Sequence, residues 1–126
     1  ISRNVEPLIV EGDAKKIRQL FSNLINNAIK YSPAGGTIQI QLTQQETRVT
    51  VAIQDNGIGI PASAMSNLFQ KFYRVDNSDT RQIGGTGLGL SICREIARGH
   101  DGEIHVESIE GQGSTFTVEL PLTQTT

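Results

Sequence analysis

The sequence lacks the features that would place it at once in several special classes of protein. Its one cysteine, Cys93, cannot form an internal disulfide, and the apolar helical pattern around it predicts a small core residue. No apolar run reaches the about eighteen residues of a membrane-spanning helix. Lysine and arginine number 11 against 13 aspartates and glutamates. The resulting net charge of -2 argues against a general polyanion binder, so we expect no nucleic-acid partner.

Length and composition fit one compact domain. The 126 residues are 37% hydrophobic, which is enough to bury a single core but not two. The start carries no signal-peptide layout, and "ISRNVEPLIVEGD" looks like a cut from a longer protein. We therefore predict a single domain over residues 1–126 that is a fragment and is monomeric in isolation. We expect it to lie in the cytoplasm, whether or not the parent protein is anchored in a membrane.

The first half of the chain predicts a strand, a helix and a hairpin. "EPLIVEGD" at 6–13 predicts a short strand closed by a turn at Gly12. Asp13 is a suitable N-cap for a helix through about Tyr31, in which apolar residues recur at helical spacing. "TIQIQLTQ" and "RVTVAIQD" alternate with period two, which predicts adjacent antiparallel strands with one buried face.

The second half predicts two more helices and a closing hairpin. "IPASAMSNLFQKF" starts a short helix with Pro61 in its first turn. The apolar pattern nearly vanishes from Tyr73 to Gly85, which predicts a mobile loop. "LGLSICREIAR" predicts a second long helix and "GEIHVESIEGQGSTFTVELPL" a hairpin. Since helices and strands mix without regular alternation, we predict an α/β fold of two layers, with helices over one face of a mixed sheet.

Four glycines lie in "QIGGTGLGLSI", directly before an apolar helical pattern, at Gly84, Gly85, Gly87 and Gly89. A Walker-type phosphate loop needs a glycine followed by lysine, and a dinucleotide-binding turn needs an apolar strand before the glycines; the sequence has neither. Glycines let backbone N–H groups approach an anion closely, and the next helix begins there with its positive end. On glycine content alone, a phosphate cradle and a flexible hinge both remain open.

The helix predicted over residues 13–31 carries a polar stripe beside its apolar face. At about 100° per residue, this stripe consists of Gln19, Asn23, Asn27 and Lys30. Asparagine is a mediocre helix former, so two of them at i and i+4 are poorly explained by helix stability. Their amide oxygens could ligate a hard cation such as Mg²⁺, and the lysine could meet a phosphate. An ordinary solvated helix face with satisfied amides remains the alternative.

The segment "DNGIGI", Asp55 to Ile60, follows the strand "VTVAIQ". Its two glycines permit a tight turn that lays backbone against a flat ligand, and Ile58 and Ile60 supply apolar contacts. An ionised Asp55 accepts hydrogen bonds and cannot donate them, which suits the exocyclic amine of adenine and rejects the carbonyl oxygen of guanine. A plain Asx-turn is the alternative. Together the three stretches predict an adenine grip, a metal-binding helix and a phosphate loop.

Five segments, in this order and spacing, resemble the sequence boxes of the catalytic ATP-binding domain of sensor histidine kinases. The wider superfamily also holds gyrase B, the large heat-shock chaperone and MutL. The N box is "QLFSNLINNAIKYSP", the first glycine box "DNGIGIP" and the phenylalanine box "LFQKFYR". The second and third glycine boxes are "GGTGLGLSI" and "GQGSTF". The resemblance covers nearly the whole chain, and five ordered boxes make it highly specific.

For the first helix, the resemblance implies contacts to the metal and the phosphates. Asn27 would ligate Mg²⁺, and Asn23 would support the metal or the phosphates. Lys30 would meet phosphate, and Tyr31 would lie on the adenine. ATP and Mg²⁺ are therefore the expected substrate and cofactor.

For the base pocket, the resemblance implies that Asp55 reads the adenine amine, with a lining of Gly57, Gly59 and Ile60. By alternation, Ser114 shares one face of the last strand with Phe116, Val118 and Leu120, and could sit behind the adenine. A bulge at Gly113 would spoil this count.

For the segment between the boxes, the resemblance implies a mobile ATP lid over about residues 73–86. Phe69 and Phe72 would anchor one end of it, and Arg74 would point toward the phosphates or the partner domain. Arg81 and Gln82 would approach the γ-phosphate. Backbone donors to the triphosphate, and the hinge of the lid, would come from Gly85, Thr86, Gly87, Leu88 and Gly89.

The family fold is a five-stranded mixed sheet backed by three helices, a two-layer sandwich of the Bergerat type. The resemblance implies transfer of the γ-phosphoryl group of Mg–ATP to a histidine on a separate helical dimerisation domain of the same protein, and indirectly to a response regulator. The expected catalytic residues are Asn27, Lys30 and Arg81. Such transfer needs positioning and charge neutralisation more than covalent help from the protein.

Two histidines could in principle accept a phosphoryl group within this chain. Neither His100 nor His105 has the acidic context of the family's phosphoacceptor helix, so we expect structural roles for both. A non-kinase ATPase of the same superfamily and a non-catalytic ATP-binding module remain alternatives. The kinase-like stretch "FYRVDNSDTRQIGGTGLGL" argues against the first, and the intact boxes argue against the second.

Overall fold

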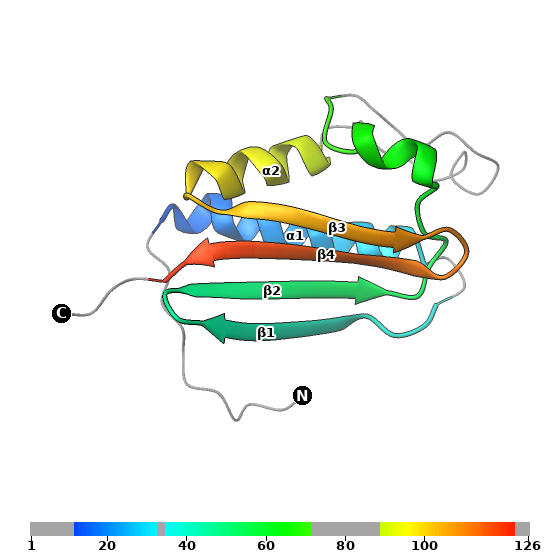
Figure 1. Cartoon of the computed structure of the whole chain (residues 1–126), viewed down its shortest axis with the longest axis horizontal. Helices are drawn as coiled ribbons and strands as arrows, with labels where there is room; N and C mark the ends of the chain where they lie inside the picture. The colour runs from blue at the N-terminus through cyan, green and yellow to red at the C-terminus, as the bar shows by residue number, and fades with distance from the viewer. Residues whose placement is uncertain (1–11, 33–34, 72–88, 123–126) are drawn as a thin grey trace.

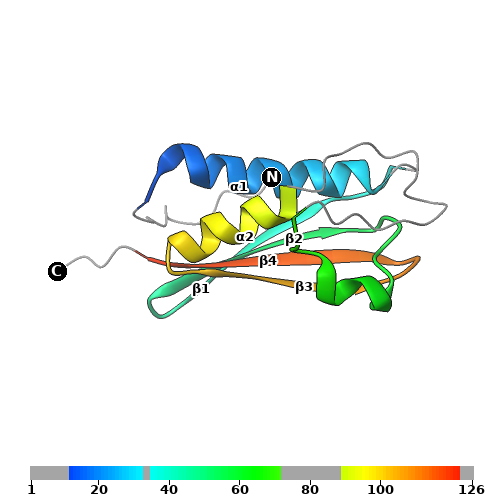
Figure 2. The same ribbon diagram turned by 90° about the horizontal axis from the view of Figure 1, so that it is seen from above.

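The computed structural model describes residues 12–32, 35–71 and 89–122, in which two α-helices lie over one face of a sheet (Figure 1). The view from above shows the same two layers (Figure 2). The elements are α1 (Ala14–Lys30), β1 (Gln39–Gln45), β2 (Arg48–Asp55), the 3₁₀ helix η1 (Ala62–Asn67), α2 (Gly89–Gly99), β3 (Glu103–Ile109) and β4 (Gly113–Pro121). The predicted two-layer α/β class is confirmed. Within these ranges, no helix combines the length and apolarity needed to cross a bilayer.

The sheet has the strand order β1-β2-β4-β3, and each neighbouring pair is antiparallel. The expected five-stranded mixed sheet is therefore four-stranded and antiparallel in the part of the chain that the structure describes. The fifth strand, predicted over residues 6–13, falls almost entirely on residues 1–11, which lie outside the described ranges. Hairpins join β1 to β2 and β3 to β4, and short connections of this kind require antiparallel neighbours.

Helix α1 begins and ends where the sequence predicts. The carboxylate of Asp13 accepts two backbone N–H groups of the first turn, at 3.0 and 3.2 Å, which otherwise have no partner within the helix. Tyr31 is the C-cap residue, and its N–H donates to the carbonyl oxygen of Asn27 at 3.0 Å. Residues at helical spacing make one face of α1 apolar and are buried in the core: Leu20, Leu24 and Ala28.

Strands β1 and β2 share an alternating sequence, yet only β2 has a buried face. The register sets Ile40 opposite Ile53, so both side chains lie on the helix-facing side of the sheet. Ile53 is 1% exposed, whereas Ile40 and Leu42 are each 51% exposed. The prediction of a buried face on β1 is therefore wrong. The reason is coverage: α1 packs mainly on β2, and α2 packs on β3 and β4, so the β1 edge projects beyond the helix layer.

The short helix after β2 also differs from the prediction. It is a 3₁₀ helix of 6 residues, and Pro61 precedes it as an extended N-cap with ψ 142° instead of forming its first turn. Ala64 and Leu68 are the buried residues of this segment. The predicted second long helix is α2, whose inner side buries Cys93, Ile96 and Ala97.

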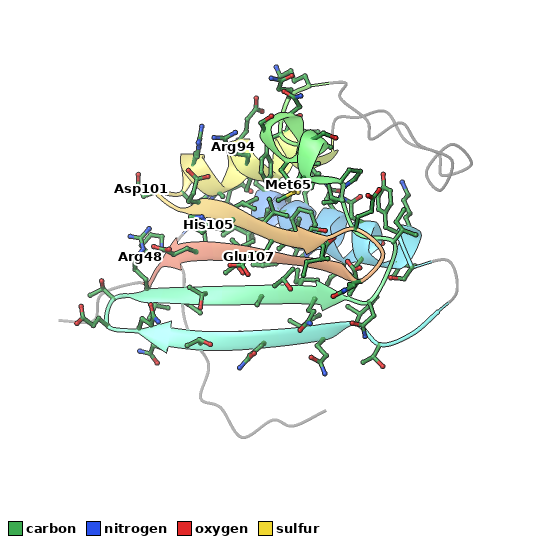
Figure 3. The ribbon with its side chains drawn as sticks, turned by 45° about the vertical axis from the view of Figure 1, so that its right-hand side comes forward. Arg48, Met65, Arg94, Asp101, His105 and Glu107 are labelled. Atoms are coloured by element: carbon green, nitrogen blue, oxygen red, sulfur yellow. The ribbon has the colours of Figure 1, made fainter. Side chains whose placement is uncertain are left out.

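The sheet face opposite the helices is polar (Figure 3). Arg48 on β2 forms an ion pair with Glu119 on β4, and His105 on β3 lies 3.9 Å from the same carboxylate. Exposed ion pairs of this kind contribute at most about 1 kcal/mol each. Because this face carries polar and charged side chains, it needs no second layer of helices to cover it.

His100 joins the end of α2 to the start of α1. Its Nδ1 lies 2.8 Å from the carbonyl oxygen of Ile96, and its Nε2 lies 3.0 Å from the backbone nitrogen of Asp13. A carbonyl oxygen only accepts and a backbone N–H only donates, so Nδ1 carries the proton and Nε2 accepts. Both ring nitrogens are thus engaged, and the structural role predicted for His100 is confirmed.

Candidate functional site

The helix-facing side of the sheet changes from apolar to polar at one end. Pairing across the strands aligns side chains in rows, of which the apolar ones are Val49–Leu120, Val51–Val118–Ile104 and Ile53–Phe116–Val106. The next row is Asp55–Ser114–Ser108. This row lies at the right-hand end of the sheet in Figure 1, near the end of α1. The register of β4 is regular, so no bulge at Gly113 shifts the count, and the predicted face of Ser114 is confirmed.

Asp55 is the buried carboxylate of this polar row. It is 4% exposed, and its Oδ1 accepts the backbone N–H of Gly57 at 2.9 Å. The backbone N–H of Ser114 also donates to this carboxylate. Burial raises the pKa of Asp55 above its usual value, and the two N–H donors oppose this by favouring the charged form. Asp55 therefore presents hydrogen-bond acceptors at a buried position with little access to water.

The loop from Asp55 to Ile60 is fixed by main-chain hydrogen bonds on two sides. On one side, the N–H of Ile58 donates to the carbonyl oxygen of Tyr31 at the end of α1, at 2.9 Å. On the other side, the N–H of Gly111 in the β3–β4 turn donates to the carbonyl oxygen of Ile58 at 2.7 Å. The loop is thus held between the helix end and the hairpin. The bond from the Gly57 N–H to Asp55 Oδ1 is itself the Asx-turn that the sequence predicted as the alternative. The helix end and the hairpin add supports that such a turn alone would lack.

Close backbone approach explains why glycine stands at key places around this loop. A Cβ on Gly57 would lie 1.9 Å from the carbonyl oxygen of Tyr31. A Cβ on Gly59, where φ is +71°, would lie 2.2 Å from the carbonyl oxygen of Ile109. Any side chain would push the loop away from its two supports. The predicted lining of Gly57, Gly59 and Ile60 therefore lies together, beside Asp55.

The predicted metal and phosphate residues lie along the last two turns of α1. Asn23 and Asn27 are half-buried on the helix, and Lys30 is exposed in its last turn. The side chain of Asn23 hydrogen-bonds to the thiol of Cys93 on α2. Burial raises the pKa of that thiol to about 11, so Cys93 is an inert core residue, as predicted. Asn23 thus also ties α1 to α2.

These residues fit a nucleotide with a bound magnesium ion. The hydroxyl oxygen of Ser32 is buried without a hydrogen-bond partner among the described residues, and a Cβ on Gly57 would lie 2.8 Å from it. This leaves an unused polar atom beside the Asp55 loop. No group of three His, Cys, Asp or Glu side chains in the described ranges could hold a metal ion. A metal here would depend on amide oxygen from Asn27 together with phosphate oxygens, which suits Mg²⁺.

The remaining predicted residues divide between the described and undescribed parts of the chain. Phe69 packs against the core, and the guanidinium of Arg94 lies 5.2 Å from its ring centroid. Gly89 is the first residue of α2. The other predicted residues lie outside the described ranges: Phe72, Arg74, Arg81, Gln82 and residues 85–88.

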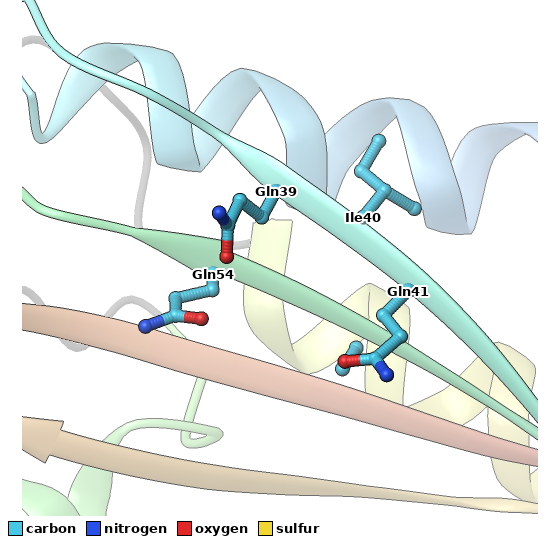
Figure 4. Close-up of a pocket in the computed structure, with 5 residues that line it drawn as sticks. Gln39, Ile40, Gln41 and Gln54 are labelled. Carbon is cyan, nitrogen blue, oxygen red and sulfur yellow. The ribbon is translucent and has the colours of Figure 1, made fainter. Parts of the chain in front are cut away.

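A separate hollow lies on the sheet away from Asp55 (Figure 4). It is lined by residues of β1 and β2, namely Gln39, Ile40, Gln41, Ala52 and Gln54. Gln54 precedes Asp55 on the strand, so its side chain projects to the opposite face. None of the residues predicted for the site lines this hollow, and we assign it no function.

The residue that sequence reasoning missed is Ser108. Its Oγ accepts the backbone N–H of Ile60 at 2.8 Å and donates to the carbonyl oxygen of Gly113 at 2.9 Å. It also lies 2.8 Å from the hydroxyl of Ser114. Ser108 therefore links the Asp55 loop to both strands of the hairpin. Alternation in "EIHVESI" places Ser108 on the same strand face as the buried Ile104. This alternation was the sequence signal that could have identified Ser108 as a residue facing the core.

Comparison with known proteins shows which family this chain belongs to. Residues 12–124 match the family described as "Histidine kinase-, DNA gyrase B-, and HSP90-like ATPase". The chain belongs to this ATPase family. It is 47% identical over 116 residues to the sensor histidine kinase WalK of Bacillus subtilis, which covers 90% of this chain and 19% of WalK. The ATPase-family domain described here thus spans about a fifth of the length of that relative.

Two solved structures share the fold of this ATPase-family domain. The catalytic domain of the histidine kinase ThkA superposes with a TM-score of 0.80 at 36% identity, covering 96% of this chain and 77% of that one. Full-length ShkA, solved in complex with AMPPNP, gives a TM-score of 0.79 at 28% identity, covering 94% of this chain and 24% of that one. The fold and the predicted resemblance to sensor histidine kinases are therefore confirmed.

Proposed function

We propose that this domain binds Mg–ATP and donates the γ-phosphoryl group to a histidine on a separate helical dimerisation domain of its parent protein. The observation that carries the proposal is the buried carboxylate of Asp55, held beside Ser114 at the polar end of the sheet in a domain of the ATPase family. The complex of the similar protein ShkA with AMPPNP, an ATP analogue, supports a nucleotide as the ligand.

Asp55 would recognise the adenine base. Two backbone N–H groups, from Gly57 and Ser114, already donate to its carboxylate and fix its orientation. The remaining lone pairs are acceptors, so they match the exocyclic amine of adenine and repel a carbonyl oxygen at the same position. Gly57 and Gly59 let the loop stay in this place, because a side chain on either would meet the carbonyl oxygen of Tyr31 or of Ile109.

The end of α1 and the start of α2 would hold the phosphates. Asn27 would supply an amide oxygen to Mg²⁺, and the metal would neutralise part of the triphosphate charge. Lys30 would place a positive charge near the phosphates. The N-terminus of α2, at Gly89, would add backbone N–H groups with the positive end of the helix dipole. This chain thus contributes binding, orientation and charge neutralisation, which are the main needs of phosphoryl transfer.

The acceptor histidine would come from another domain. His100 uses both ring nitrogens for hydrogen bonds within the fold. His105 lies on the outer face of the sheet, opposite the row that contains Asp55. Neither imidazole faces the candidate site. A helical phosphoacceptor domain and, beyond it, a response regulator are therefore the proposed partners, in the cytoplasm.

Calorimetric titration with Mg–ATP tests the binding step. Asp55→Asn replaces one carboxylate oxygen, which accepts, by an amide NH2 group, which only donates, so we expect a loss of about 2 to 3 kcal/mol in binding free energy. Asp101→Asn is the matched control, because it removes the same charge from an exposed turn. Equal ATP affinity in the wild type, Asp55→Asn and Asp101→Asn would refute the assignment of Asp55.

A further inference from the structure

Ser108, Ser114 and Asp55 form one row across three strands, and the row has a fixed pattern of hydrogen-bond donors. The register pairs Ser114 with Asp55 on one side and with Ser108 on the other. Ser114 is 8% exposed, so its hydroxyl must find its partners within the fold or in a bound ligand. Which of its neighbours receives the Ser114 proton decides what the hydroxyl can offer to a ligand.

The neighbours of Ser108 settle the position of its own proton. A hydroxyl group has one proton and two lone pairs. The carbonyl oxygen of Gly113, 2.9 Å from Ser108 Oγ, can only accept, so it takes the Ser108 proton. The N–H of Ile60, at 2.8 Å, can only donate, and it occupies one lone pair of Ser108. If Ser108 donated elsewhere, two oxygens would face each other at 2.9 Å with no proton between them.

This arrangement determines the direction of the remaining contact. The Oγ atoms of Ser108 and Ser114 lie 2.8 Å apart, so one of them donates to the other. The Ser108 proton is already committed to Gly113, and Ser108 still has one lone pair. Ser114 must therefore be the donor. Its only hydroxyl proton points toward Ser108, and only its lone pairs are left for the side of Asp55.

We infer that Ser108 is a positioning residue that holds the Ser114 hydroxyl as a hydrogen-bond acceptor and thereby sharpens selection of a 6-amino purine over a 6-oxo purine. This inference rests on the proposed function, in which the base lies against Asp55. A carboxylate always accepts, but a free serine hydroxyl can rotate and donate its proton to a carbonyl oxygen. Ser108 removes that option, so Asp55 and Ser114 together present acceptors alone to the base or to a water that bridges to it.

The test compares the dissociation constants of ATP and inosine triphosphate. Their bases differ at position 6, which carries an amino or an oxo group, and at N1, which is an acceptor in adenine and carries a proton in hypoxanthine. In the wild type we expect clear preference for ATP. Ser108→Ala frees the Ser114 proton, so the preference should fall by about fivefold to tenfold, the size of one gained or lost hydrogen bond. General loosening of the loop would weaken both nucleotides alike and leave their ratio unchanged.

Matched variants isolate the hydroxyl. Ser108→Thr keeps the donor and acceptor atoms and should keep the wild-type ratio. Ser114→Ala removes the group on which Ser108 acts, so adding Ser108→Ala to it should change the ratio no further. If Ser108→Ala does not fold, as judged by circular dichroism, Ser108→Cys fills the same place with a much weaker hydrogen-bonding group and should lower the ratio in the same direction.

The failure of this inference is distinct from failure of the proposed function. An unchanged ratio of ATP to inosine triphosphate affinity in folded Ser108→Ala, or in Ser108→Cys if the alanine variant is unfolded, would overturn the role of Ser108 while leaving ATP binding intact. A further fall in the ratio when Ser108→Ala is added to Ser114→Ala would also overturn it. A wild-type domain that binds neither nucleotide would instead refute the proposed function.

Discussion

The two halves of the candidate site are built in different ways. The base half, around Asp55, is assembled from the loop after β2, the end of α1 and the β3–β4 turn, and main-chain hydrogen bonds join these segments. The helix half consists of side chains on one helix, Asn27 and Lys30, whose backbone would have the same shape with other residues. In the base half, the atoms that hold the fold together are therefore also the atoms proposed to bind the ligand. In the helix half, the proposed ligand-binding side chains are not needed for the fold.

This difference predicts how substitutions divide between stability and binding. A change in the base half moves the backbone of a neighbouring segment, so it alters folding as well as ligand affinity. A change at Asn27 or Lys30 on α1 alters what the site can bind and leaves the core in place. The following predictions run from the largest expected effect to the smallest.

Gly113→Ala should cause the largest loss of stability. A Cβ there would lie 2.1 Å from the carbonyl oxygen of Asp55, and φ is +126°. We expect the free energy of unfolding to fall by about 3 kcal/mol or more, measured by chemical denaturation. Gly111→Ala is the control on the same hairpin: φ is +84°, but nothing lies within 4 Å, so it should cost only about 1 kcal/mol. Equal losses would show that the backbone approach to Asp55 does not matter.

Asn27→Ala should separate binding from stability in the helix half. Alanine is the better helix former, so the free energy of unfolding should change by no more than about 0.5 kcal/mol. ATP affinity in Mg²⁺ should weaken by about 1 to 2 kcal/mol, with a far smaller change in excess chelator, because only the metal-bridged contact is lost. Calorimetry in both buffers measures this. The same loss with and without Mg²⁺ would assign Asn27 to the fold or to direct phosphate contact.

Acid should weaken ATP binding through Asp55. Burial raises the pKa of this carboxyl, so it takes up a proton at a higher pH than the ordinary aspartate value of about 3.9. As the pH falls through the raised pKa, an acceptor is lost, and affinity should drop by up to about tenfold per pH unit. Asp55→Asn lacks this titration and serves as the reference for protonation of ATP itself. Parallel pH profiles for the two proteins would contradict the assignment.

Protonation of Asp55 should act on folding with the opposite sign. A carboxyl whose pKa is raised in the folded state contributes stability that is complete below its unfolded pKa and is lost as the pH rises through the folded one. At a pH where Asp55 is ionised in the ligand-free domain, its burial therefore lowers the stability of the fold. Denaturation of the wild type and of Asp55→Asn at a series of pH values measures that contribution. The free energy of unfolding of the wild type, relative to that of Asp55→Asn, should fall as the pH rises through the raised pKa of Asp55.

The sequence predicted the features that depend on short stretches of chain. Asp13 caps α1 because a carboxylate before a helical pattern accepts the first free N–H groups, whatever surrounds it. Ser114 lies on the buried face of β4 because alternation along one strand is local. A tight loop from Asp55 to Ile60 was predicted because an aspartate and two glycines lie close together in the chain.

The features that sequence reasoning missed depend on segments far apart in the chain. The exposure of Ile40 on β1 follows from which strands the helices cover, and alternation alone does not contain that information. Ser108 gains its role from pairing with Ser114 and from contact with Ile60, 48 residues away. The support of the loop by the Gly111 N–H likewise needs the position of the hairpin.

Phosphoryl transfer from γ-labelled ATP to the helical domain of the parent protein is the measurement that tests the account most directly. We predict no label on the isolated domain and, when the matched helical dimer is added, label on that partner that is lost in acid and survives base, as for a phosphoramidate. Asn27→Ala should abolish the transfer. Acid-labile label on the isolated domain, removed by His100→Ala or His105→Ala, would contradict the account, as would an unlabelled partner despite confirmed ATP binding.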